Sequence, residues 1–265
     1  MWRALSLSLS LALALGMLAA GCDLVFTIDV ADAPPSTHDE DGDGLFDDVD
    51  NCPVTSNPPN TPGAPQDDLD GDGVGDVCDP HAATPGDSIA ALEFFNGNFG
   101  DFWTPDINTW TAGSDTLTSP ESPAAGADQH FLLRQSIQAK NATMEVGFTV
   151  LDFGPEGNKN EISIRLDADT DMAHCDLVEQ QRDDRSELEI GTQGFSTGTQ
   201  FMPEVPVGSS LRLRLTRNVP DEVCSVGSAS TTLVNTDPTA VIMIPSVVLV
   251  DFQVRLDFIA IYQVQ

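Results

Sequence analysis

The sequence predicts a mainly β protein in which an acidic, irregular segment precedes a C-terminal antiparallel β-sandwich. Two observations lead to this prediction. From about Ile89 onward, short runs of alternating apolar and polar residues are separated by turn-forming stretches such as "GPEGNKN". From Asp39 to Pro80, the chain has 13 acidic residues, no Lys or Arg, and few large apolar side chains. We find no amphipathic helix of ordinary length in either region.

The strands are predicted from a period of two residues, which places alternate side chains on opposite faces of a half-buried strand. In "TMEVGFTV", the apolar face is made of Met144, Val146, Phe148 and Val150. In "LRLRLTR", Leu211, Leu213 and Leu215 lie opposite Arg212 and Arg214. The runs "NEISIRL", "HCDLVEQ", "SELEI" and "VDFQVRLDFIAIYQV" behave similarly. Many short strands separated by turns are typical of an antiparallel sandwich, which we expect over residues 88–265.

The overall charge restricts the class of partner. The chain carries 42 acidic and 11 basic residues, and its formal net charge is −31. A protein that binds nucleic acid needs Lys and Arg to neutralise phosphates, so we expect no nucleic-acid partner. A hydrophobic content of 40% is sufficient for a sizeable core.

The N-terminus has the features of an export signal. Residues 1–21 contain an early charge at Arg3, an apolar run from Ala4 to Leu18, and small residues before Cys22. The run is short for a membrane span and ends in a cleavage-type sequence, so it predicts a secretory signal peptide. Residues 22–37 come next as a tether that ends in Pro34-Pro35, which favours an extended chain.

The letters "LAAGC" at the end of this signal resemble the lipobox of bacterial lipoproteins. The resemblance implies cleavage before Cys22 and a diacylglycerol on its sulfur. We therefore expect a lipid-anchored protein of the bacterial cell envelope, at the outer membrane or cell surface. The alternative is an ordinary signal peptide with an incidental Cys22.

The other four cysteines are Cys52, Cys78, Cys175 and Cys224. An even number in an exported chain favours disulfides, and four cysteines allow three pairings. Proximity in the sequence favours Cys52 with Cys78 and Cys175 with Cys224. None of them has the close Cys or His spacing of a zinc site.

The acidic region contains one pattern twice. The pattern D-x-D-x-D-G-x-x-D-x-x-D occurs from residue 39 and again 29 residues later. The first copy has Asp39, Asp41, Asp43, Gly44, Asp47 and Asp50, and the second has Asp68, Asp70, Asp72, Gly73, Asp76 and Asp79. "DADTD", Asp167 to Asp171, begins in the same way, but Met172 stands where Gly is needed. We expect that stretch to be an acidic turn.

This repeated pattern predicts calcium sites. Calcium takes about six to eight oxygen ligands at about 2.3–2.6 Å, and alternate carboxylates on a tight loop can converge on one ion. Gly at the sixth position permits the sharp turn, and the seventh residue, Leu45 or Val74, would offer its carbonyl oxygen. Position twelve is Asp rather than Glu and no flanking helices are evident, so the repeats are not EF-hands. The alternative is a solvated acidic linker, which gives no reason for Gly and Asp to recur at fixed positions.

The two stretches "DEDGDGLFDDVDNCP" and "QDDLDGDGVGDVCDP" resemble thrombospondin type 3 repeats. The resemblance covers residues 38–80, and residues 81–87 would link them to the sandwich. In that family calcium ions form the centre of a segment with little hydrophobic core, and a disulfide joins the two repeat cysteines. The resemblance therefore implies calcium and a Cys52–Cys78 bridge.

The C-terminal region resembles the concanavalin A-like, or laminin G-like, jelly roll. The residues that carry this resemblance are the opening "IAALEFFNGNFGDFWTPDINTWTAGSDTLTS" and the closing "VDFQVRLDFIAIYQV". The family implies a last strand that returns beside the first. Its members mostly bind carbohydrate or protein, and some hydrolyse glycans.

No catalytic motif is evident in the sandwich. Laminarinase-like members carry E-x-D-x-x-E on one strand, which this chain lacks, and its four His residues are scattered. We therefore expect a protein that is not an enzyme. We expect Trp103 and Trp110 to pack in the core, although either could stack on a sugar. The expected function is calcium-dependent adhesion or binding of a surface glycan or protein. The alternatives are a glycan hydrolase with an unrecognised site and a purely structural envelope protein.

Overall fold

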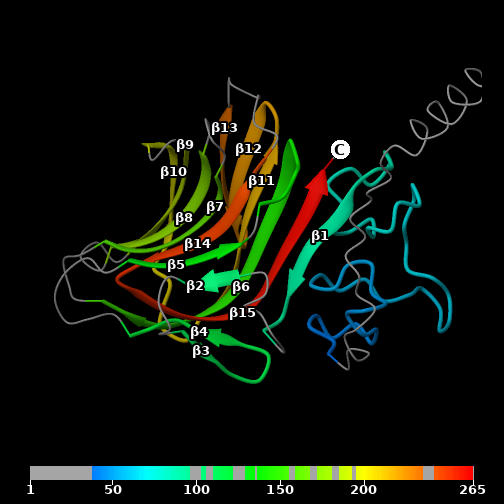
Figure 1. Cartoon of the computed structure of the whole chain (residues 1–265), viewed down its shortest axis with the longest axis horizontal. Coiled ribbons are helices and arrows are strands. Elements are labelled where there is room, and N and C mark those ends of the chain that lie inside the picture. Colours follow the sequence, from blue (N-terminus) through cyan, green and yellow to red (C-terminus); the bar gives the residue numbers. More distant parts are fainter. Residues whose placement is uncertain are drawn as a thin grey trace, which may run out of the picture. The chain divides into compact units, whose positions relative to one another are not determined.

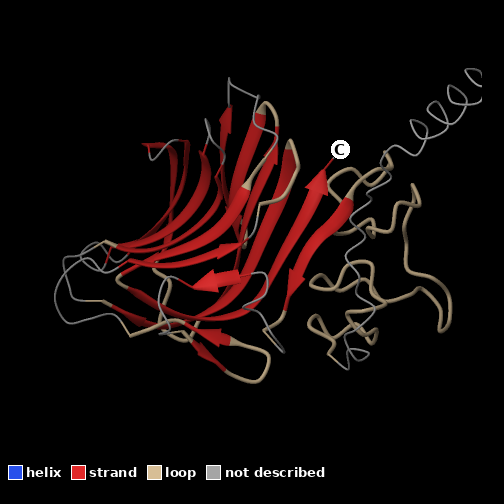
Figure 2. Ribbon diagram, in the orientation of Figure 1, coloured by secondary structure: helices blue, strands red, loops and turns tan. Residues whose placement is uncertain are grey.

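The computed structural model describes residues 38–95, 103–105, 110–121, 129–134, 136–154, 159–167, 172–180, 185–192, 195–234 and 242–264. In these ranges the regular elements are all strands, and the paired strands are antiparallel. They form two sheets, which confirms the predicted β-sandwich (Figures 1 and 2). The same ranges contain no helix that is long and apolar enough to cross a membrane. The predicted signal peptide, Cys22 and the tether lie outside the described residues.

The first sheet has eight strands. They are β1 (Ser88–Glu93), β3 (Thr111–Ala112), β4 (Leu117–Thr118), β6 (Asn141–Phe153), β11 (Ser210–Asn218), β12 (Asp221–Val226), β13 (Ala229–Val234) and β15 (Phe252–Val264). Their order is β13-β12-β11-β6-β15-β4-β3, and β1 also pairs with β15. The first and last strands thus lie side by side, with Ile89 opposite Tyr262, as the family resemblance implied (Figure 1).

The second sheet has seven strands. They are β2 (Trp103–Pro105), β5 (Gln129–Arg134), β7 (Asn160–Asp167), β8 (Met172–Gln180), β9 (Arg185–Thr192), β10 (Phe195–Pro203) and β14 (Ile244–Val250). Their order is β10-β9-β8-β7-β14-β5-β2. The central strands β7, β8 and β9 are consecutive in the chain and joined as antiparallel neighbours, so their side chains stand in register across the sheet.

The core lies between the inner faces of the two sheets and follows the predicted alternation. Met144 and Phe148 of β6 and Leu213 of β11 are fully buried there. Trp103 and Trp110 belong to the same cluster, so neither indole offers a free face for stacking on a sugar. The prediction that both tryptophans pack in the core is confirmed.

Both favoured disulfides are present in the structure. The Cys52 and Cys78 sulfurs are bonded within the repeats, and the Cys175 and Cys224 sulfurs are bonded within the sandwich. The second bridge joins β8 of one sheet to β12 of the other and therefore crosses the core. Closing a loop of this length, with a sequence separation of 49, stabilises the fold by about 4 kcal/mol in the chain-entropy model.

The repeat segment, residues 38–80, contains no helix or strand, and it packs on the sandwich as part of one compact unit that spans His38–Gln265. A second apolar cluster holds the contact, separate from the main core. The repeat segment supplies Cys52, Val54, Val74 and Cys78, and the sandwich supplies Phe94, Phe258, Ala260 and Tyr262. We call this set the docking cluster.

The outer face of β6 and β15 is shaped to receive the repeat segment. Gly147 of β6 lies under the ring of Phe258, and a Cβ at this glycine would stand 2.3 Å from a ring carbon. The Arg212 guanidinium lies 5.0 Å from the centre of the same ring, and its Nη1 donates a hydrogen bond to the carbonyl oxygen of Val54. Apolar packing, a cation–π contact and a hydrogen bond therefore act on one junction.

Candidate metal centres in the acidic repeats

The structure brings together the first three carboxylates of each acidic pattern. Asp39, Asp41 and Asp43 form one group and Asp68, Asp70 and Asp72 form the other, with one oxygen from each residue within 4.8 Å of the other two in its group. Such convergence of like charges is repulsive without a compensating cation, and carboxylate oxygens are the ligands that a hard cation prefers. These two groups are the candidate metal centres.

The backbone of the first loop is folded around its own carboxylates. Asp39 accepts hydrogen bonds from the backbone N–H groups of Asp43 and Gly44, both at 3.1 Å. Gly44 has a φ of 95°, in a region that side chains other than glycine rarely adopt. This folding of the backbone brings the carboxylates of Asp39, Asp41 and Asp43 together.

The second loop repeats this arrangement. Asp68 accepts hydrogen bonds from Gly71 N at 2.8 Å and from Gly73 N at 3.1 Å. Gly73 has a φ of 98°, almost the value of Gly44 at the equivalent position. The glycines are required for their backbone angles, because a Cβ on either one would meet no atom within 4 Å.

One carboxylate oxygen in each loop indicates where a cation fits. Asp41 Oδ2 and Asp70 Oδ2, at equivalent positions of the two patterns, are buried and have no hydrogen-bond partner. A buried oxygen without a partner carries a desolvation cost that a bound cation would remove. Burial, together with the nearby carboxylates of Asp43, Asp50 and Asp39, raises the pKa of Asp41 to about 6. The residues present therefore fit a divalent cation.

The later acidic positions of each pattern are fixed by backbone N–H groups. Asp47 accepts from Glu40 N at 3.1 Å, and Asp76 accepts from Leu69 N at 2.7 Å. Asp47 also lies 2.9 Å from the ring of His38.

The last acidic position of each pattern is held in the same manner. Asp50 accepts a hydrogen bond from Cys52 N at 2.7 Å, and Asp79 accepts one from His81 N at 2.6 Å. The structure thus positions these four carboxylates, and their role as ligands stays a prediction. The same holds for the carbonyl groups of Leu45 and Val74.

The third Asp of each pattern also accepts hydrogen bonds from backbone N–H groups later in the chain, which the sequence pattern did not predict. Asp43 Oδ2 accepts a hydrogen bond from Asn57 N at 3.1 Å. Asp72 Oδ2 accepts from Gly86 N at 2.9 Å and from Asp87 N at 2.8 Å. Each central carboxylate therefore holds the chain 14 residues further on, and in the second repeat that chain is the linker to β1.

Gln66 is a further residue that the acidic pattern did not predict. Its Nε2 donates to Asp50 Oδ1 at 2.7 Å and to Asn57 Oδ1 at 2.8 Å, and its Oε1 accepts from Asn51 N at 3.0 Å. It connects the first repeat to the entry of the second. The available signal was the position of Asn51 and Gln66 directly beside the two acidic runs.

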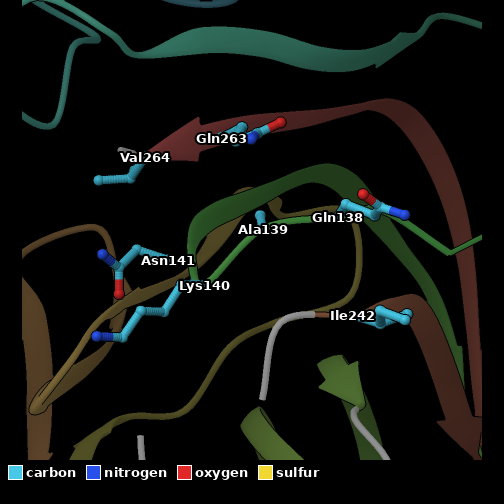
Figure 3. Close-up of a pocket in the computed structure, with 7 residues that line it drawn as sticks. All are labelled: Gln138, Ala139, Lys140, Asn141, Ile242, Gln263 and Val264. Carbon is cyan, nitrogen blue, oxygen red and sulfur yellow. The ribbon is translucent and has the colours of Figure 1, made fainter. Parts of the chain in front are cut away.

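A shallow hollow at one end of the sandwich is a less convincing ligand site. Figure 3 shows Lys140 and Asn141 on one side of it and Gln138 and Ile242 on the other. The polar ends do not point toward a common centre, and Asn141 Oδ1 is already used by Val219 N at 3.0 Å. Binding pockets place a few polar groups so that they converge, and this hollow does not.

The two antiparallel sheets and the pairing of β1 with β15 define a β-sandwich of the jelly-roll type. No protein-family model and no curated protein matches the sequence. Three solved structures resemble the sandwich. The first is an endo-acting O-glycanase from human gut bacteria, with a TM-score of 0.53 and 8% identity over 67% of this chain and 100% of that chain. The second is the CBM2 module of the Lactobacillus casei BL23 phage J-1 evolved Dit, with a TM-score of 0.52 and 9% identity over 67% of this chain and 96% of that chain. The third is the exoplasmic/lumenal domain of VIP36 with Ca²⁺ and Man3GlcNAc, with a TM-score of 0.51 and 7% identity over 66% of this chain and 88% of that chain.

The expectation that the chain is not an enzyme is corrected by these comparisons. Glycan-cleaving enzymes are among the proteins that share its fold, although an identity of 8% shows the fold alone. The expectation was wrong because it relied on the absence of the E-x-D-x-x-E motif, whose carboxylates all lie on one strand. Side chains on neighbouring strands also stand about 4.5–5.5 Å apart, so a pair of carboxylates needs no single-strand motif.

Proposed function

We propose that this protein is a calcium-binding lipoprotein of the bacterial cell envelope that binds a surface glycan through its jelly-roll domain. The two acidic loops would each hold calcium through Asp39, Asp41 and Asp43 or through Asp68, Asp70 and Asp72. When bound, the ion supplies positive charge that offsets the mutual repulsion of these carboxylates. Calcium is the hard cation best suited to flexible loops of many oxygen ligands.

The observation that carries the calcium proposal is the buried, unpartnered oxygen at the same position of both loops, Asp41 Oδ2 and Asp70 Oδ2. A solvated acidic linker would leave both oxygens in water. The glycan proposal is supported by the fold, since structures that resemble the sandwich include a CBM2 module and a mannose-oligosaccharide complex. Adhesion to a glycan-bearing surface would follow from binding of this kind.

Calorimetric titration of the whole exported chain with calcium tests the metal proposal. Asp41→Asn and Asp70→Asn keep an oxygen for the local hydrogen bond and remove one negative charge from each loop. We expect each change to weaken one class of site about tenfold or more, because affinity follows the charge and number of ligands.

Asp48→Asn is the matched control, since Asp48 is an exposed carboxylate of the same segment outside the pattern. Its titration should resemble that of the wild type. Absence of calcium uptake by the wild type at millimolar concentration, or an equal effect of all three substitutions, would contradict the assignment.

The lipid anchor is tested separately. We expect the wild type to partition into detergent and the Cys22→Ser protein to remain in the aqueous phase or keep its signal peptide, because a diacylglycerol needs the Cys22 sulfur. Each buried methylene contributes about 0.8 kcal/mol to membrane binding, so the change in partition should be large. Identical partitioning of the two proteins would exclude lipidation at this residue.

A further inference from the structure

The outer face of the seven-stranded sheet, turned away from the core, carries charged side chains that are as buried as core residues. Asp176 and His174 of β8 are each 4% exposed, and Glu161 of β7 is 5% exposed. Their neighbours in sequence, such as Ile162 and Cys175, fill the core on the opposite face. Charges are expensive to bury, and this group adds nothing to the apolar core.

The strand register places these side chains in one block. Ser163 of β7 lies opposite Asp176 of β8, which in turn lies opposite Glu189 of β9. Two pairs further along, on the same face of the sheet, Arg165 lies opposite His174. Directly opposed residues are close enough for their side chains to interact. We call Glu161, Ser163, Arg165, His174, Asp176 and Glu189 the polar cluster.

Hydrogen bonds and ion pairs join the polar cluster. The Ser163 hydroxyl donates to Asp176 Oδ1 at 2.5 Å, and Arg165 Nε donates to the Ser163 oxygen at 2.9 Å. The Lys159 ammonium lies 2.5 Å from Glu161 and 3.5 Å from Glu189. The cluster thus presents both hydrogen-bond donors and acceptors, with positive and negative charges side by side.

The network leaves one ring nitrogen unused. His174 Nε2 lies 3.6 Å from Asp176 Oδ2, whereas the buried His174 Nδ1 has no hydrogen-bond partner. Burial and the nearby Glu161 carboxylate raise the pKa of Asp176 to about 7, so this carboxyl group can donate as well as accept a proton near neutrality. Buried polar groups with unused capacity and perturbed pKa values occur preferentially at functional sites.

The border of the polar cluster is open to solvent on the side of β9 and β10. Phe201 is 56% exposed and lies opposite Glu187, and the Arg185 guanidinium lies 4.0 Å from its ring centre. Lys159 is half exposed at another edge. An accessible aromatic ring beside a cluster of hydrogen-bonding groups matches both parts of a sugar, its apolar face and its hydroxyl groups.

We propose that the polar cluster is a binding site for a carbohydrate, in which Asp176, His174 and Glu189 hydrogen-bond to adjacent hydroxyl groups of one sugar ring. This inference rests on the proposed glycan binding and names the residues that perform it. The mixed charge of the cluster favours a neutral sugar over a strongly anionic one.

A glycan array in calcium-containing buffer, combined with thermal unfolding of the whole protein, tests the site. The array carries mannose oligosaccharides, β-glucans and mucin-type O-glycans as probes. We expect Asp176→Asn and Glu189→Gln to reduce binding of the retained probes about tenfold or more, the effect of losing a hydrogen bond to a charged group. Glu204→Gln, which alters an exposed carboxylate after β10, should bind as the wild type does.

Thermal unfolding separates a binding site from a structural network. If the polar cluster exists for binding, the neutral substitutions relieve charge burial and the Tm should stay level or rise. Binding unchanged in both variants would overturn this inference and leave the proposed function standing. A Tm lowered by several degrees in both variants would overturn it as well, because the cluster would then be structural. A wild type that binds no probe would overturn both the proposed glycan binding and this site. The proposed calcium binding would be unaffected, because the calcium titration tests it independently.

Discussion

Removal of calcium with EDTA should release the repeat segment from the sandwich and expose residues 38–80 to proteases. The segment buries only a few apolar side chains in the docking cluster, chiefly Val54 and Val74. These cannot offset about 1–2 kcal/mol of backbone entropy for each residue that is ordered. Without cations, the carboxylates of both loops also repel one another. Ordering of the segment should therefore depend on the ions.

Limited proteolysis with and without EDTA, followed by mass spectrometry, measures this release. Cleavage should fall within residues 38–80, and the strands of the sandwich should stay protected because their core contains no predicted ligand. A dye that binds apolar surface should fluoresce more strongly in EDTA, since Phe94, Phe258 and Tyr262 become exposed. Equal protease resistance in calcium and in EDTA would refute the dependence on ions.

Substitution of the central carboxylates should reproduce the effect of EDTA in part. Asp43→Ala removes one proposed ligand and the hydrogen bond from Asn57 N, whereas Asp72→Ala removes one proposed ligand and the hydrogen bonds from Gly86 N and Asp87 N. The second change also loosens the connection to β1, so we expect it to increase cleavage more than the first does.

Truncation of Phe258 should undock the repeat segment even when calcium is present. The ring is 2% exposed and lies between Gly147 on one side and the repeat segment on the other. Replacing a buried Phe by Ala costs about 3–5 kcal/mol. It would also remove the cation–π contact with Arg212, which is oriented toward Val54. Chemical unfolding in saturating calcium should show the loss.

Phe46→Ala is the matched control, because Phe46 belongs to the repeat segment and is 49% exposed. Its effect on the free energy of unfolding should be small. If Phe258→Ala costs no more than Phe46→Ala, the docking cluster does not hold the two parts together. Protease cleavage within residues 38–80 of the Phe258→Ala protein, in calcium, would show that the docking cluster does hold the repeat segment on the sandwich.

The alternation of apolar and polar residues was enough to predict the strands. It could not predict which outward-facing side chains are buried by other parts of the protein. The alternation around Met144 and Leu213 has a period of two, and the structure buries the expected face. The same alternation marks Glu145 and Glu161 as solvent-facing, yet both are nearly buried. One is close to the docked repeat segment and the other lies in the polar cluster. Neither neighbour can be deduced from the strand that carries the residue.

The repeat segment shows the same limit. The spacing of Asp and Gly was sufficient to predict two equivalent loops, and the cysteine positions favoured the observed disulfide. The largest apolar side chains of the segment do not show which residues it buries, because Phe46 and Leu69 are both exposed. The buried residues are instead the smaller Val54 and Val74. Their burial depends on a sheet surface that forms only when strands distant in the sequence have paired.

The two acidic patterns differ at the second residue after their last Asp, and this difference limits where further repeats could be added. Cys52 comes after the first loop and bonds to Cys78, whereas the equivalent position after the second loop is His81. His81 Nε2 lies 3.0 Å from Asn218 Nδ2 of β11, and its other ring nitrogen lies 3.4 Å from Asp87. An additional copy inserted at this point would separate the last loop from the strand it contacts. Additional repeats could therefore be accommodated upstream of His38, where they would lengthen the repeat segment and leave its junction with the sandwich unchanged.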